Sequence, residues 1–286
     1  MIITKLRGGL GNQLFQFSAG YYFSKKKRTK LLIDSSWYDN ISKKDTARCC
    51  LVQEITGSDF EIIERGRIAS SLLRNRLINK LFLAREEKQF EFCEDIPSRY
   101  PLTILDGYWQ SRFYADAARE YLRQKILEIN LSEEATILAK KIENNRAAVV
   151  VHVRRGDFFN KNNLSTYGIC TDNYYLNSIK FFLSEIGSNA KFFVFSDDYD
   201  WISKSEIFKS NCEIVRPMSL DGLMDFVVMS KASNYVISNS TYSWWAAYIS
   251  KNTLNESMVL MPEYWISGVR VSSKNFHLEK SRLMTG

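Results

Sequence analysis

The sequence contains little histidine and no ordered set of cysteines. Only His152 and His277 occur among its 286 residues, so a metal centre built on histidine is difficult to assemble. The five cysteines are an odd number without a Cys-x-x-Cys pair. These counts argue against both a disulfide framework and a zinc site, and they favour reduced thiols.

Long apolar runs are also missing. No window approaches 18 apolar residues, and residues 2–6 form a strand-like run with no charged leader before an apolar stretch. We therefore expect neither a membrane span nor a signal peptide, and we predict a cytoplasmic protein. A nucleophilic serine is not expected either, because there is no G-x-S-x-G motif and there are too few histidines for a triad.

The composition that is present is that of a globular protein with a basic balance. Hydrophobic residues make up 45% and charged residues 25% of the chain, values that argue against wholesale disorder. The 39 lysines and arginines exceed the 32 acidic residues by seven. This excess favours an anionic partner: a nucleic acid, an anionic membrane face or a phosphorylated ligand.

Strand-like and helix-like segments alternate along the chain, which predicts parallel sheets. The length suits one large or two moderate α/β domains. Asn144 and Asn145 break the pattern before a central strand, so we place a domain boundary there, between residues 1–145 and 146–286. The predicted strands are 2–6, 30–34, 102–105, 147–153, 191–195, 213–215 and 234–237, and the predicted helices are 13–27, 113–129, 132–143, 173–185, 199–208, 220–230 and 242–249.

A basic stretch covers residues 65–85 and contains no acidic residue. Its apolar residues recur at helical spacing, which predicts a basic amphipathic helix. Such a helix can lie on an anionic lipid surface. More often it packs on the protein core and exposes its polar face, and the sequence leaves both readings open.

The chain is organised around residues 147–158. Its apolar start predicts a buried strand of a parallel sheet. The strand runs into His152, Arg154, Arg155, Gly156 and Asp157, at the position where open α/β sheets bind ligands. Paired arginines suit a phosphate group, although a surface cluster of ion pairs is an equally open alternative.

The glycine-rich turn at residues 8–13 resembles a dinucleotide fingerprint but fails it, because Leu14 stands where the last glycine is required. The P-loop sequence is absent as well. What remains is a flexible backbone that leads into a helix N-terminus and offers N–H groups to an anion or a sugar hydroxyl. A tight turn without a ligand explains the glycines equally well.

Two further polar clusters follow predicted strands, at 196–198 and 238–241. Because parallel strands bring their carboxyl ends to one edge, we expect both clusters to share a crevice with the arginines. Asp198 and Asp200 match a D-x-D metal pattern, but we interpret Asp197 and Asp198 as a helix cap and an acceptor for a guanine edge. The hydroxyls before Trp244 predict a phosphate-binding helix N-terminus or an ordinary cap.

Five motifs in this order resemble the α-1,2-fucosyltransferases, especially the bacterial enzymes that build O-antigen or other surface glycans. The resemblance covers nearly the whole chain. The motifs are Gly8-Gly9-Leu10-Gly11-Asn12-Gln13-Leu14-Phe15-Gln16, Gly107-Tyr108-Trp109-Gln110-Ser111, His152-Val153-Arg154-Arg155-Gly156-Asp157-Phe158, Phe195-Ser196-Asp197-Asp198 with Trp201, and Ser238-Asn239-Ser240-Thr241-Tyr242-Ser243-Trp244-Trp245.

The resemblance implies a GT-B-like α/β fold in which two Rossmann-like domains face a central cleft. It implies inverting, metal-independent transfer of L-fucose from GDP-β-L-fucose to the 2-hydroxyl of a β-galactoside. Residues 146–286 would bind GDP-fucose, and residues 1–145 would form the acceptor side. No cofactor beyond the donor is implied. The acceptor would be a galactose-terminated oligosaccharide or a lipid-linked glycan, with no nucleic acid involved, and contact of the 65–85 stretch with the inner face of the membrane stays open.

The resemblance also implies roles for individual residues. Arg154 and Arg155 would bind the diphosphate, and Asp157, the carboxylate within that motif, is our candidate for the general base, although it could instead orient Arg154. The other substrate-binding candidates are His152, Asp197 and Asp198 for guanosine, Ser240, Thr241 and Ser243 for the phosphates, and Gly9, Gly11, Asn12 and Gln13 from the first domain.

Two departures from the family pattern leave the acceptor open. Tyr167 stands where relatives often have histidine before Gly-x-Cys, and Ala232-Ser233 precedes the last motif where other residues are usual. Two alternatives also stay open: a related transferase with another linkage or nucleotide sugar, and a basic nucleic-acid-binding protein. The second alternative requires cations on one face with stacking aromatics, whereas the cations of this chain are scattered.

Overall fold

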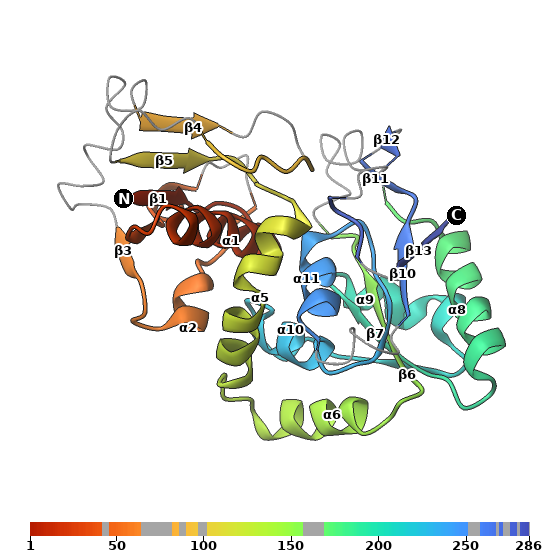
Figure 1. The fold of residues 1–286 in the computed structure, drawn as a ribbon. Helices are drawn as coiled ribbons and strands as arrows, with labels where there is room; N and C mark the ends of the chain where they lie inside the picture. The colour runs from red at the N-terminus through yellow and green to blue at the C-terminus, as the bar shows by residue number, and fades with distance from the viewer. Residues whose placement is uncertain are drawn as a thin grey trace. The chain divides into compact units, whose positions relative to one another are not determined.

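The computed structural model describes residues 1–41, 46–63, 82–85, 90–96, 102–156, 169–250, 258–266, 269–270, 275–278 and 281–285 (Figure 1). Contacts between Cα atoms divide the chain into two compact units. Unit 1 consists of Met1–Glu128 and Ser273–Phe276, and unit 2 of Ile129–Ser272 and His277–Gly286. Within these described ranges, no helix is both long and apolar enough to cross a bilayer.

Unit 1 is an α/β unit built on a five-stranded parallel sheet. Its elements are β1 (Ile2–Lys5), α1 (Leu10–Lys26), β2 (Leu31–Asp34), η1 (Tyr38–Asn40), α2 (Val52–Thr56), β3 (Glu61–Ile63), β4 (Leu83–Arg85), β5 (Thr103–Asp106) and α5 (Arg112–Leu127). The strand order is β3-β2-β1-β5-β4, with every pairing parallel. The order reverses between β1 and β5, so this is the topological switch point of the sheet.

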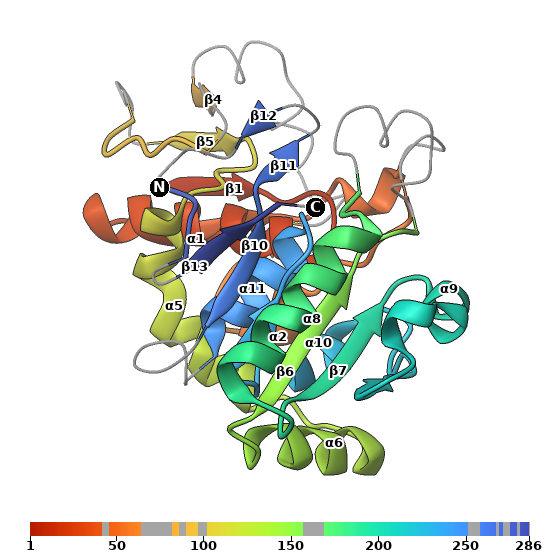
Figure 2. The same ribbon diagram turned by 90° about the vertical axis from the view of Figure 1, so that its right-hand side faces the viewer.

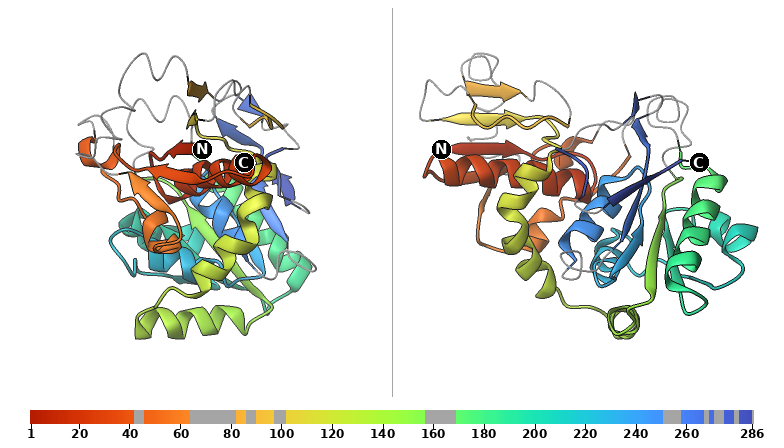
Figure 3. Two further views of the ribbon diagram at one scale, coloured as in Figure 1. Left: turned by 60° about the vertical axis from the view of Figure 1, so that its left-hand side comes forward. Right: turned by 45° about the vertical axis from the view of Figure 1, so that its right-hand side comes forward.

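Helix α1 is the central helix of unit 1. It lies against β1 and β2, and α5 and α2 pack against it on the same side of the sheet (Figures 1 and 3). Gly20 permits this close packing, because a Cβ atom there would lie 2.8 Å from Leu31 Cδ1 and 3.0 Å from Thr4 Cβ. A glycine inside a helix costs about 1 kcal/mol relative to alanine, so packing accounts for its presence.

Unit 2 is a Rossmann-like unit with helices on both faces of a six-stranded parallel sheet. Its elements are α6 (Glu133–Glu143), β6 (Ala148–Val153), α8 (Asp172–Ile186), β7 (Lys191–Ser196), α9 (Tyr199–Lys204), η3 (Glu206–Phe208), β8 (Cys212–Ile214), α10 (Leu223–Met229), β9 (Asn234–Val236), α11 (Thr241–Ile249), β10 (Val259–Pro262) and β13 (Ser281–Met284), with a small antiparallel pair of β11 (Tyr264–Ile266) and β12 (Val269–Arg270). Helix α8 covers one face, and α10 and α11 lie on the other (Figure 2).

The order of strands in unit 2 is that of the Rossmann fold. Read from one edge, it is β8-β7-β6-β9-β10-β13. Numbered along the chain, these strands follow the order 3-2-1-4-5-6 found in dinucleotide-binding domains. The switch point therefore lies between β6 and β9. Strand β6 is buried along its whole length, as its uninterrupted apolar sequence predicts.

The predicted fold class is confirmed: the chain is α/β with parallel sheets in two Rossmann-like units, as a GT-B-like fold requires, whereas the central cleft stays a prediction. The seven predicted strands occur, and so do six of the seven helices, with ends that shift by a few residues, whereas the predicted helix 199–208 is divided into α9 and η3 by the extended residue Ser205. Helix α10 begins late, at Leu223, because Gly222 before it has a left-handed backbone with φ of 79°. Helix α2 and the short strands β3, β4, β10, β11, β12 and β13 were not predicted.

Two predictions need correction or fall outside the description. Residues 65–81 of the predicted basic helix lie outside the described residues, and the end of that stretch, Leu83–Arg85, is strand β4. The units divide at 128/129 instead of 145/146. The reason is that α6 packs against α10 of unit 2 and that Lys141 of α6 pairs with Glu213 of β8.

Candidate functional site

Three polar strand ends meet at the switch point of unit 2. Strand β6 pairs with β7, where Val153 stands opposite Ser196, and with β9, where Val151 stands opposite Val236. The residues that follow β6, β7 and β9 therefore emerge at the same edge of the sheet. This is the edge at which open α/β sheets bind their ligands.

Asp197 holds the turn after β6. Its Oδ2 atom lies 2.9 Å from Nη1 of Arg154, and its Oδ1 atom accepts a 2.8 Å hydrogen bond from the backbone N–H of Arg155. Gly156 fits beside this carboxylate because it has no side chain: a Cβ atom there would lie 2.8 Å from Oδ2. One carboxylate thus fixes both arginine positions. The predicted contact of Asp197 with a guanine edge stays a prediction, beside this contact with Arg154.

Arg155 is held by a different pair of groups. Its guanidinium carbon lies 3.6 Å from the centroid of the Trp201 ring, a stacking contact, and its Nε atom is 3.8 Å from Oδ2 of Asp198. Asp198 also caps α9, because its Oδ1 atom accepts the backbone N–H of Trp201 at 3.1 Å. The predicted cap is therefore present. A planar guanidinium fixed on an aromatic ring loses little further side-chain entropy when it binds an anion.

The arginines are not an ordinary surface cluster. The side chains of Arg154 and Arg155 are only 16% and 14% exposed. Partly buried ion pairs carry a desolvation cost that a surface pair avoids, so such an arrangement needs a reason other than stability. A planar guanidinium matches the geometry of phosphate oxygens. Two of them on one turn are therefore the side-chain type that suits a phosphate group.

His152 lies beneath this turn as a neutral ring. It is buried, and its Nδ1 atom lies 2.8 Å from the hydroxyl oxygen of Ser238, which follows β9. Burial lowers the pKa of His152 to about 3, with a further lowering by Arg154 and an opposing effect of Asp197. The ring therefore links the ends of β6 and β9 as a neutral hydrogen-bonding group, and it brings no positive charge to the site.

The hydroxyls after β9 differ in burial: Ser240 and Ser243 are buried, and Thr241 is half-buried. Ser240 is the N-cap residue of α11, and Thr241 next to it is half-buried. Ser243 is completely buried and donates its hydroxyl to the carbonyl of Ser240 at 3.2 Å. We predicted a phosphate contact for Ser243, but its position assigns it to support of the helix start.

The predicted residues of unit 1 also separate by position. Gly9 is the N-cap residue of α1, and Gly11 is buried in the first turn. Asn12 is half-buried and accepts a 2.9 Å hydrogen bond from Gln110. These three residues lie after β1, at the carboxyl edge of the sheet of unit 1, and their contact with a substrate stays a prediction.

Gln13 requires a correction. It is completely buried, and its amide nitrogen donates to the carbonyls of Gly8 and Cys49. Its amide oxygen accepts the backbone N–H groups of Leu51 and Val52. All four hydrogen-bonding positions of the amide are thus used by backbone, so Gln13 holds the glycine-rich turn and does not reach a substrate.

Asp157, the candidate base, lies outside the described residues, and its role stays a prediction. The sequence reading missed two positioning contacts, those of Trp201 with Arg155 and of Ser238 with His152. Trp201 and Ser238 both belong to the motifs given above, so the motifs could have indicated these two contacts. Among the described residues, no group of three or more His, Cys, Asp or Glu side chains could hold a metal ion.

Comparisons with known proteins agree with the motifs. Residues 70–279 match the family described as Glycosyl transferase family 11. An α-1,2-colitosyltransferase of Escherichia coli is 31% identical over 281 residues, covering 96% of this chain and 95% of that protein. An O-antigen biosynthesis glycosyltransferase of Escherichia coli is 28% identical and covers 92% and 94%. A galactoside 2-α-L-fucosyltransferase of Bos taurus is 24% identical and covers 92% and 67%.

The burial of His152 predicts the direction in which pH changes stability. A histidine in the unfolded chain has a pKa of about 6.5, whereas burial lowers the pKa of His152 in the folded protein. The contribution of neutral His152 to the free energy of unfolding is therefore fully present above about pH 6.5. It is lost as the pH falls toward the pKa of the folded state, because the unfolded chain then binds a proton that the folded protein does not. Between about pH 7.5 and 5.5, the advantage of the natural protein over His152→Asn should shrink by about 1.4 kcal/mol.

Urea unfolding followed by circular dichroism at the two pH values measures this change. His277→Asn is the control for loss of a histidine as such. Equal shrinkage in both variants would contradict the assignment of the pH effect to His152.

Proposed function

Because this chain belongs to glycosyl transferase family 11, we propose that it transfers L-fucose from GDP-β-L-fucose to the 2-hydroxyl of a β-galactoside with inversion. The observation that carries the proposal is the pair of arginines at the switch point of unit 2, each held by its own carboxylate. The name of the Bos taurus relative supports the sugar and the linkage. The name of one Escherichia coli relative supports a place in O-antigen synthesis.

The proposed role of the arginines is to stabilise the leaving group. As the bond to fucose breaks, negative charge grows on the diphosphate of GDP. Donors that are already fixed where this charge develops lower the barrier without reorganisation. Asp197 and Trp201 provide that fixation for Arg154 and Arg155. Two guanidinium groups can balance a diphosphate, so we propose that no divalent metal is required.

The acceptor hydroxyl must attack from the face opposite GDP and lose its proton late in an oxocarbenium-like step. We propose Asp157 as the base that takes this proton. Unit 1 would bind the acceptor glycan, and unit 2 would bind GDP-fucose. The membrane contact of residues 65–85 and a cytoplasmic location remain predictions from sequence.

A colitosyl donor is the second candidate. The α-1,2-colitosyltransferase of Escherichia coli is 31% identical over nearly the whole chain. Colitose is fucose without its 3-hydroxyl, so a GDP-activated form would present the same nucleotide and diphosphate to unit 2. Discrimination would then depend on the group that hydrogen-bonds the 3-hydroxyl.

The experiment that tests the function compares the two donors. Purified protein is incubated with GDP-fucose or GDP-colitose and a panel of β-galactosides, and release of GDP and the linkage of the product are measured. We expect kcat/KM for GDP-fucose to be at least about tenfold higher, with an α-1,2 product. Preference for GDP-colitose would favour the second candidate, and no transfer from either donor would refute the proposal.

The leaving-group role predicts a large loss of turnover in Arg154→Ala. We expect kcat to fall at least about 100-fold, equivalent to about 3 kcal/mol of transition-state stabilisation. The matched control is Arg282→Ala, which removes an arginine 4.8 Å above the Phe181 ring in the same unit. That variant should keep its rate. Similar rates for Arg154→Ala and the natural protein would rule out this role.

Metal independence predicts that chelation has no effect. Transfer from GDP-fucose should proceed at an unchanged rate after dialysis against EDTA. A rate that falls to background and returns with Mn²⁺ would instead support the D-x-D interpretation of Asp198 and Asp200.

A further inference from the structure

The switch point of unit 1 carries a polar cluster that the donor site does not use. Strands β1 and β5 are parallel neighbours, with Thr4 opposite Leu105. Arg7 follows β1, and Asp106 is the last residue of β5. The two charged residues therefore stand side by side at the edge where an open α/β sheet binds its ligand.

The cluster consists of a cation, a carboxylate and an aromatic ring. The closest approach of Arg7 to Asp106 is 3.4 Å, from Nη1 to Oδ1, longer than the roughly 2.7 to 2.9 Å of a charge-assisted hydrogen bond. The guanidinium carbon of Arg7 lies 4.8 Å from the centroid of the Tyr108 ring. Nε of Arg7 is buried and has no hydrogen-bond partner among the described residues. The side chains of Arg7 and Asp106 are 38% and 24% exposed, so a ligand can reach both.

A buried glutamine fixes the spacing of the cluster. Gln16 is completely buried, and its amide oxygen accepts the backbone N–H of Arg7 at 2.9 Å. Its amide nitrogen donates to the carbonyl of Gly107 at 3.2 Å. One side chain of α1 thus ties the segment after β1 to the segment after β5. Hydrogen bonds from a buried side chain to the backbone of a site hold that site in a fixed geometry.

The segment after β5 is also strained. Trp109 is buried and has a positive φ of 53°, a conformation that is rare for a bulky residue. It separates Tyr108, which faces Arg7, from Gln110, which donates to Asn12 at 2.9 Å. Strain of this kind persists where the surrounding structure enforces it, often beside a ligand.

We propose that Arg7, Asp106 and Tyr108 bind the terminal pyranose of the acceptor glycan, an inference that rests on the proposed function. Arg7 offers N–H donors and Asp106 offers acceptors, which together match neighbouring hydroxyls of a neutral sugar. The Tyr108 ring offers a flat apolar surface for the C–H groups of the pyranose. The charges of Arg7 and Asp106 cancel, and a carboxylate repels phosphate, so this cluster favours the neutral acceptor over the donor diphosphate.

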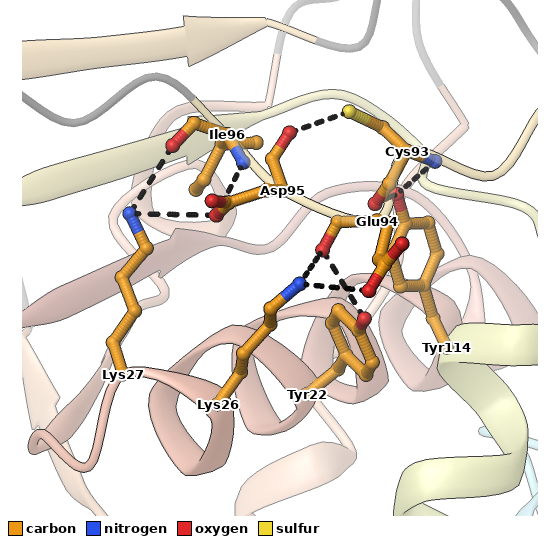
Figure 4. A network of polar contacts seen from close by, with 8 residues as sticks. All are labelled: Tyr22, Lys26, Lys27, Cys93, Glu94, Asp95, Ile96 and Tyr114. Atoms are coloured by element: carbon orange, nitrogen blue, oxygen red, sulfur yellow. Dashed lines mark hydrogen bonds and ion pairs between the residues drawn. The ribbon is translucent and has the colours of Figure 1, made fainter.

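A second cluster of the same three kinds of group provides a matched control. Lys26, at the other end of α1, lies 3.3 Å from Glu94 and 6.0 Å from the ring of Tyr22 (Figure 4). The Glu94 side chain is 80% exposed, and the cluster lies at the end of the helix far from the carboxyl edge of the sheet. It is an ordinary surface pair of the kind that contributes little.

The test uses Arg7→Lys, Asp106→Asn and Tyr108→Leu, with Lys26→Gln as the control. We expect KM for a β-galactoside acceptor to rise about tenfold or more in the first three variants, since each loses a polar or stacking partner of the sugar. KM for GDP-fucose and the rate of donor hydrolysis should stay within about twofold of the natural protein. Lys26→Gln should match the natural protein in every constant.

A second measurement does not depend on turnover. Saturation-transfer NMR with methyl β-galactoside detects sugar bound to the full-length protein, and its signal should fall in the three variants but not in Lys26→Gln. An unchanged acceptor KM and NMR signal in folded Asp106→Asn and Arg7→Lys would overturn the inference, as would a selective rise in KM for GDP-fucose. If the natural protein transfers no fucose, the proposed function fails, and the NMR comparison still decides whether this cluster binds sugar.

Discussion

The carboxylate of Asp197 is the interaction on which the site in unit 2 depends. It reaches across from the end of β7 to bind the guanidinium of Arg154 and the backbone N–H of Arg155. It also brings a negative charge to two neighbouring cations that would otherwise repel each other. The proximity of Gly156 follows from the same contact, because a side chain there would displace the carboxylate. A single carboxylate after β7 thus determines both where the arginine charges lie and how the backbone turns after β6.

The two units carry similar charged pairs at their switch points, but the geometry of the pairs differs. Each has a switch point, and each places an arginine and an aspartate from neighbouring strands there. In unit 2 the ion pair of Arg154 with Asp197 is short, and a stacked tryptophan adds to it. In unit 1 the pair of Arg7 with Asp106 is looser and partly open. A tight, donor-rich turn suits a charged diphosphate, whereas a loose neutral pair beside an aromatic ring suits hydroxyls.

Sequence periodicity and motif order predicted the fold class and the edge of the sheet at which the arginines lie. They could not predict which groups face the ligand, because that depends on side-chain partners distant in sequence. Gln13 shows this clearly: a polar residue in a glycine-rich motif pointed to substrate, yet four backbone groups, three of them beyond residue 48, occupy its amide. Ser243 is similar: its hydroxyl was predicted to contact phosphate, but it donates to the carbonyl of Ser240 one helical turn earlier. Short strands such as β3 lack enough residues for a period to appear.

The attachment of α6 to unit 2 has a practical consequence for dissecting the protein. This helix packs against α10, and its buried residues are Ala135, Ala139 and Ile142. A recombinant fragment that started after Asn145 would strip this cover and leave apolar surface in water, at a cost of about 25 cal/mol for each Å² uncovered. A fragment that started at Ile129 would keep the helix with its neighbour and would retain this apolar cover.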